Sequence, residues 1–108
     1  RADLSAAEAR ANAALLEAQG AIRSSTARVA ASEARLSAAN QGEEAAQEAY
    51  RLARIGYEAG KLPLVELVNA RRALAEARSQ SIAAAVERAG ARAAQARLGG
   101  FAAPGVQP

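Results

Sequence analysis

The sequence lacks several residue types on which whole classes of protein depend. It contains no cysteine and no histidine among its 108 residues. A disulfide scaffold, a zinc site built from cysteine and histidine, a thiol nucleophile and a histidine general base are therefore excluded. No glycine-rich phosphate loop and no cluster of metal ligands is visible. We therefore predict no catalytic residues, no cofactor and no metal site, and we do not expect an enzyme.

Large apolar side chains are also scarce. Aromatic residues make up 3% of the chain, with no tryptophan and no methionine, and about a third of the residues are alanine. Because a buried alanine removes little surface from water, these residues cannot fill a thick globular core. Alanine, leucine, arginine, glutamate and glutamine instead favour long helices, and the small side chains allow helices to pack closely.

Charge and hydropathy exclude two further classes. The formal net charge is +3, and the arginines and glutamates alternate along the chain instead of forming a basic stripe. With no stacking aromatics beside them, nucleic acid is not an expected partner. No apolar run approaches the roughly 20 residues that span a bilayer as a helix. The start at Arg1 does not resemble a signal peptide, and we expect the sequence to be a fragment of a larger chain.

A seven-residue repeat runs through the first half of the sequence. Large residues recur every seven positions, with a break at Glu43, and a small residue follows three positions after each. The large row is Leu15, Ile22, Val29, Leu36, Tyr50 and Tyr57, and the small row is Ala18, Ser25, Ser32, Ala39, Ala46 and Ala53. This pattern predicts a coiled-coil seam, and the small row favours tight antiparallel packing.

One break interrupts the helical pattern, around Gly60. We expect Gly60 to occupy the left-handed position after a helix end, Pro63 to lie in the first turn of the next helix, and Tyr57 to pack across the turn. The predicted fold is all-α, a long antiparallel helical hairpin with helices at about 3–59 and 63–98. Residues 1–98 form the hairpin, and residues 99–108 form an irregular tail that starts at Gly99-Gly100.

The two predicted helices differ in length. The seam of the second helix is expected at Leu67, Ala70, Leu74, Ala77, Ser81, Ala84, Ala91 and Leu98, with a second stripe at Ile82, Val86 and Ala89. The shorter helix can cover only about residues 25–59 of the first. Leu15 and Ile22 are then left without a partner in the chain, so we expect the isolated fragment to dimerise or to form a bundle.

The turn carries a resemblance to a known family. Its spacing resembles the periplasmic tip of TolC-like outer-membrane efflux proteins, and the resemblance extends over roughly residues 45–99. The matching elements are Tyr57, Gly60, Leu64, Leu67, Val68 and Ala70. The run Gly60-Lys61-Leu62-Pro63-Leu64 resembles the heavy-metal cation branch of that family more than the drug branch.

The resemblance implies a setting in a Gram-negative bacterium. Family members are homotrimers whose long helices form a tunnel through the periplasm, and their contact with the outer membrane is through β-strands that this sequence does not contain. Export of small solutes or metal ions through the tunnel is passive. Gly60, Lys61 and Leu62 match the tip residues that contact a periplasmic adaptor protein and, through it, an inner-membrane pump.

The resemblance also implies a gate early in the second helix. Glu66 matches the first of two acidic positions that face the lumen in relatives, and Asn69 stands at the second, where Asp is usual. From the residues alone, Glu66 is an acid in the first turn, where it interacts favourably with the helix dipole. For Asn69 two roles stay open, membership of a hydrogen-bond network between subunits or simple exposure to solvent.

Two other functions remain open from the residues. The first is a coiled-coil structural or adaptor hairpin with no channel role, although such arms usually carry an Arg-Leu-Ser-Asp-like pattern at their turn, which the segment at Gly60 lacks. The second is a fragment of an enzyme, which would need a positioned titratable pair in a pocket.

Overall fold

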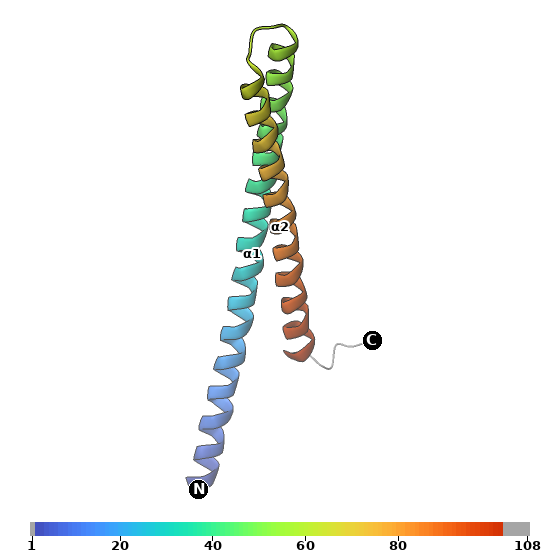
Figure 1. Cartoon of the computed structure of the whole chain (residues 1–108). Coiled ribbons are helices and arrows are strands. Elements are labelled where there is room, and N and C mark those ends of the chain that lie inside the picture. The colour runs from blue at the N-terminus through green and yellow to red at the C-terminus, as the bar shows by residue number, and fades with distance from the viewer. Residues whose placement is uncertain (1, 103–108) are drawn as a thin grey trace. The chain divides into compact units, whose positions relative to one another are not determined.

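The structure, a computed structural model that describes residues 2–102, contains two α-helices. Helix α1 covers Ala2–Glu58 and helix α2 covers Leu64–Ala102. The two helices run in opposite directions and are joined by a short turn (Figure 1). This confirms the prediction of an all-helical chain with two long antiparallel helices.

The chain divides into two units, each containing part of both helices. The hairpin unit comprises residues 32–88 and includes the turn, and the terminal unit comprises residues 1–31 and 89–108.

The α1 side of the hairpin unit presents a continuous seam at the predicted seven-residue spacing. Ser32 is completely buried and Ala53 is buried, while the positions between them are half-buried. These half-buried positions are Leu36, Ala39, Glu43, Ala46 and Tyr50. The row therefore does not break at Glu43, as the sequence pattern suggested. The charged residue lies in the seam itself.

The α2 side of the hairpin unit follows the same repeat. Leu74 is 7% exposed and Ala84 is 9% exposed, and both belong to the predicted seam. The half-buried members are Leu67, Ala70, Ala77, Ser81 and Arg88, of which Arg88 was not predicted. The proposed second stripe is open to solvent, because Ile82 and Val86 are both about two-thirds exposed.

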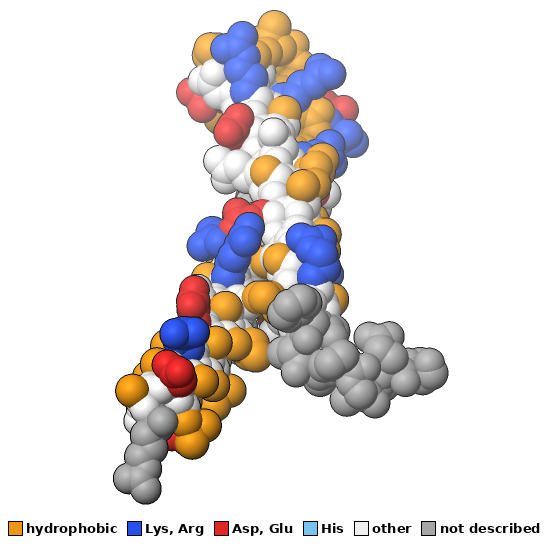
Figure 2. Space-filling view, turned by 90° about the horizontal axis from the view of Figure 1, so that it is seen from below, with side chains coloured by type: hydrophobic (Ala, Val, Ile, Leu, Met, Phe, Trp, Pro, Cys, Tyr) orange, Lys and Arg blue, Asp and Glu red, His pale blue; other side chains and the backbone are white. Residues whose placement is uncertain are grey.

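The terminal unit has a shorter stretch of contact. Val29 and Ala91 are buried, and Gln95 donates a hydrogen bond from Nε2 to Thr26 Oγ1 at 3.3 Å. Towards the start of α1, Leu4, Leu15 and Leu16 are all more than half exposed. Apolar side chains cover much of the surface of this end of α1 (Figure 2). As expected from the sequence, Leu15 is more exposed than covered in the part of the chain that the structure describes.

The helix boundaries require two corrections. Helix α2 does not end at Gly99-Gly100 but continues to Ala102, because glycine weakens a helix by only about 1 kcal/mol and does not by itself stop it. The remainder of the predicted tail, residues 103–108, lies outside the described residues. Pro63 also lies just before α2 instead of in its first turn. Within the described residues, neither helix is long and apolar enough to cross a membrane.

Candidate functional site at the turn

The end of α1 is closed by a Schellman motif built on Gly60. The Gly60 N–H donates to the Tyr57 carbonyl at 2.9 Å, and the Lys61 N–H donates to the Gly56 carbonyl at 2.8 Å. Gly60 has φ of 74°, in the left-handed region that glycine adopts without steric cost. The predicted helix end at Gly60 is confirmed, and the two bonds satisfy carbonyl groups that the helix would otherwise leave unpaired.

A close contact between Gly56 and Leu62 completes the turn. The Leu62 N–H donates to the Gly56 carbonyl at 3.2 Å, and the Leu62 side chain lies directly over Gly56. A Cβ atom at position 56 would approach Leu62 Cδ1 to 2.7 Å. Position 56 is half-buried, whereas the neighbouring Tyr57 is 40% exposed. The absence of a side chain at Gly56 therefore lets the turn fold back onto the helix end.

The start of α2 follows Pro63 directly. The Pro63 carbonyl accepts a hydrogen bond from the Glu66 N–H at 3.1 Å, which begins the helical pattern. Glu66 is the acidic residue in the first turn of α2. Its carboxylate lies where the helix dipole favours negative charge.

The surface of the turn is apolar and open. Leu62 is 38% exposed, and Leu64 and Val65 are each more than half exposed. Lys61 is also exposed and is the one lysine of the chain. A protruding turn with apolar side chains around a single positive charge has the character of a contact surface.

Glu66 and Asn69 lie one helical turn apart and are both exposed. Within the described part of the chain, neither side chain has a hydrogen-bond or ion-pair partner. Arg71 and Arg72 follow on the same helix and are exposed as well. The structure thus places the two predicted gate residues side by side on a solvent-facing stretch of α2, free to meet other groups.

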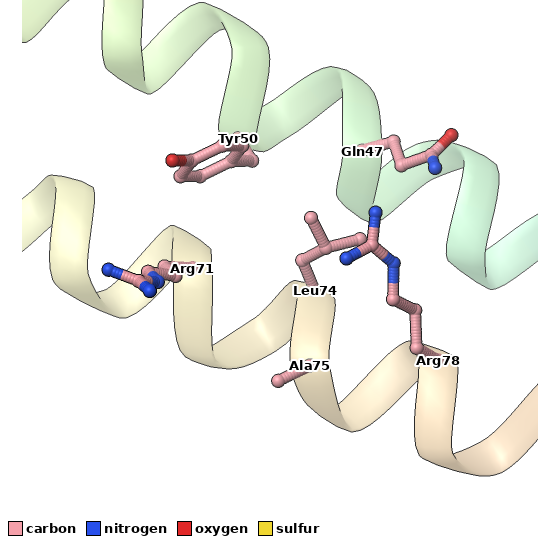
Figure 3. Close-up of a pocket in the computed structure, with 6 residues that line it drawn as sticks. All are labelled: Gln47, Tyr50, Arg71, Leu74, Ala75 and Arg78. Carbon is pink, nitrogen blue, oxygen red and sulfur yellow. The ribbon is translucent and has the colours of Figure 1, made fainter.

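Further along the hairpin unit, the structure reveals a polar cluster that was not predicted, although Ser81 itself was a predicted seam residue. Ser81 donates a hydrogen bond from Oγ to Glu43 Oε1 at 2.6 Å, and Arg78 Nε lies 3.7 Å from Glu43 Oε2. Nearby, Arg78 and Leu74 from α2 point towards α1 and line a pocket together with Gln47 and Tyr50 of α1 (Figure 3). The sequence did contain an indication of this cluster, because Glu43 occupies a position in the row of large residues. That position was taken as an interruption of the row.

The site has no arrangement suited to bond-making chemistry. Within the described residues, no group of three or more acidic side chains could hold a metal ion. The turn and the adjoining seam present apolar contacts, helix ends and isolated charges. Such an arrangement suits binding and packing between helices.

Comparison with protein families shows to which family the chain belongs. The family described as "Outer membrane efflux protein" matches residues 1–100 of the chain. The chain belongs to the outer membrane efflux protein family. This family consists of transport channels and not of enzymes. The match extends the resemblance from the region around the turn to nearly the whole sequence.

The match is to the family as a whole, and it does not support the heavy-metal branch suggested by the Gly60–Leu64 segment. Comparisons with curated proteins and with solved structures found no match. The two long antiparallel helices are consistent with part of an outer-membrane efflux channel.

Proposed function

We propose that this chain forms part of the periplasmic tunnel of a trimeric outer-membrane efflux channel, through which small solutes leave the cell passively. The family match over residues 1–100 carries this proposal. The long antiparallel helices supply walls for such a tunnel, and the exposed apolar residues on their outer faces, such as Ile82 and Val86, offer contacts to neighbouring helices.

The turn is the proposed docking point for a periplasmic adaptor protein, coupled in turn to an inner-membrane pump. Leu62, Leu64 and Val65 expose apolar surface there, and Lys61 adds a positive charge. The Schellman motif holds Lys61 and Leu62 on a short loop, and Leu64 and Val65 lie in the first turn of α2, so binding a partner would order few additional residues. Gly60 contributes the backbone geometry of the loop, and Lys61 and Leu62 contribute the contacts.

Glu66 and Asn69 are proposed to face the lumen near its periplasmic entrance. In a trimer, three copies of Glu66 would form a ring of negative charge that favours cations. Three copies of Asn69 would form a neutral ring beside it. The exposure of both side chains and their lack of partners in the described part of the chain support this assignment.

Photocrosslinking tests the docking proposal. A photoreactive residue replaces Lys61 in the parent protein, expressed in cells together with its adaptor. Irradiation should produce a covalent channel–adaptor product. The same residue at Ser79, which is also exposed but lies further along α2, serves as the control and should give little product. Equal yields at the two positions, or none at Lys61, would show that the turn is not the docking point.

Single-channel recording in planar bilayers tests the gate. We expect Glu66→Gln to reduce the preference of the parent channel for cations and Asn69→Asp to increase it, because ring charge controls selectivity. Glu76→Gln removes an exposed carboxylate further along α2 and is the matched control. Unchanged selectivity in both Glu66→Gln and Asn69→Asp would refute the gate assignment while leaving the family membership intact.

The alternative of a structural or adaptor hairpin without a channel role has no observation in its favour. It predicts that disrupting the turn leaves export unaffected. Loss of export in cells carrying Leu62→Asp in the parent protein, with normal channel abundance in the outer membrane, would separate the two functions in favour of the channel.

A further inference from the structure

The seam of the hairpin unit is built from rows that repeat every seven residues on both helices. On α1 the small row is Ser32, Ala39, Ala46 and Ala53, and on α2 it is Ala70, Ala77 and Ala84. If one helix moved along the other by seven residues, alanine would again face alanine. The apolar packing of this seam therefore distinguishes poorly between one register and the next.

Glu43, Ser81 and Arg78, which we call the Glu43 cluster, make the observed register different from its neighbours. The Glu43 side chain is half-buried, with 26% of its surface exposed. Its carboxylate accepts the hydrogen bond from Ser81 and lies 3.7 Å from the Arg78 guanidinium. A second charged pair, Arg35 with Glu87, joins the same two helices two turns further from the connecting loop.

A slip by one heptad would disrupt the Glu43 cluster. If Leu74 took the place of Ser81, the half-buried carboxylate would lose its hydrogen-bond donor and would face an apolar side chain. A partly covered charged group that loses its hydrogen-bond donor costs free energy, more than a neutral group would.

We propose that Glu43, through Ser81 and Arg78, selects the register in which α1 and α2 pair within the hairpin unit. A single polar residue in a coiled-coil seam commonly has this effect, at some cost in stability. The competing explanation is that the connecting turn alone sets the register, through the Gly60 motif and the contact between Gly56 and Leu62. The two explanations make different predictions for variants that remove the cluster and leave the turn untouched.

Disulfide trapping in the 108-residue chain distinguishes them, because the sequence contains no cysteine of its own. Ala39 and Ala84 line the same groove between the helices, so Ala39→Cys with Ala84→Cys reports the observed register. Ala39→Cys with Ala77→Cys reports a register shifted by seven residues. Each pair is equilibrated in a glutathione buffer, and the intramolecular disulfide is measured on the monomer band of a non-reducing gel.

With Glu43 and Ser81 present, the Ala39–Ala84 pair should form a disulfide and the Ala39–Ala77 pair should not. In the Glu43→Leu, Ser81→Ala background, the shifted disulfide should increase by about tenfold or more, because both registers now bury similar apolar surface. The melting temperature of this background should not fall, since replacing polar residues in a helix seam with apolar ones is often neutral or stabilising.

Glu44→Leu is the matched control, because it removes a carboxylate from an adjacent exposed position. It should leave the crosslinking pattern of the wild type unchanged. If the Glu43→Leu, Ser81→Ala background keeps its helix content and still forms only the Ala39–Ala84 disulfide, the turn sets the register and the proposal is wrong. If that background loses helix content by circular dichroism, Glu43→Gln decides: a shifted disulfide above the wild-type level supports the proposal, and the wild-type pattern overturns it.

Discussion

Two stretches of the same helix, residues 2–24 and 32–58 of α1, follow the same sequence pattern with different outcomes. In the second stretch the pattern places Ser32 and Ala53 against α2, where both are buried. In the first stretch it places Leu15 in open solvent, with more than half of its surface exposed. A seven-residue repeat therefore predicts which face of a helix packs against another helix, but it does not show whether that second helix belongs to the same chain.

Removing a large side chain from each stretch should give the sharpest contrast. Leu74→Ala takes away the largest buried apolar side chain of the hairpin unit, and we expect it to lower the free energy of unfolding by about 2–3 kcal/mol. Leu15→Ala removes a side chain that is already exposed and should change that free energy by less than about 0.5 kcal/mol. Urea unfolding followed by circular dichroism measures both. Equal losses at low protein concentration would mean that Leu15 is buried in the folded monomer, contrary to the structure.

A pair of glycine substitutions contrasts the turn with the helix interior. Gly60→Ala forces a Cβ into the left-handed region and should destabilise the chain by about 1–2 kcal/mol. Gly42→Ala meets no atom within 4 Å and should stabilise α1 by up to about 1 kcal/mol. Thermal unfolding curves for the two variants should shift in opposite directions. A stabilising Gly60→Ala would contradict the backbone conformation at the turn.

The uncovered stretch of α1 should also influence association. We expect the 108-residue chain to dimerise or form a bundle at high concentration, because Leu15 and Ile22 present apolar surface without a partner in the described part of the chain. Leu15→Glu with Ile22→Glu should weaken this association without reducing helix content. Sedimentation velocity over a range of concentrations measures the effect, and a wild-type chain that stays monomeric throughout would count against it.

The smallest effect is expected from an ion pair on the solvent face of α1. The hydrogen bond from Arg51 holds the pKa of Glu48 below its ordinary value, and Glu48 raises that of Arg51. A lowered carboxyl pKa contributes stability that is present above the pKa of the unfolded chain and is lost as the pH falls through the pKa of the folded chain. The small difference in melting temperature between wild type and Arg51→Gln should therefore disappear in acid. A difference that grew as the pH fell would contradict this sign.

The backbone features of the candidate site could be predicted, because they depend on the conformational preferences of a few neighbouring residues. The helix end at Gly60 follows from the conformational freedom of glycine, and the first-turn position of Glu66 follows from Pro63, three residues earlier. Helix α2 passing through Gly99 and Gly100 shows the limit of such preferences, since an unfavourable residue weakens a helix without ending it. The contact of Leu62 with Gly56 was not predicted, because it depends on how the chain folds back at the turn.

The sequence by itself determined the two helices, the position of the turn and the face along which the helices pack. These features depend on helix propensity, glycine geometry and a periodic pattern, all of which act over a few residues. Only the tertiary structure decided that Glu43 joins the seam and that the start of α1 remains uncovered. A charged residue in a periodic row can either interrupt packing or find a partner, and the outcome depends on whether the facing helix brings a donor such as Ser81 within reach.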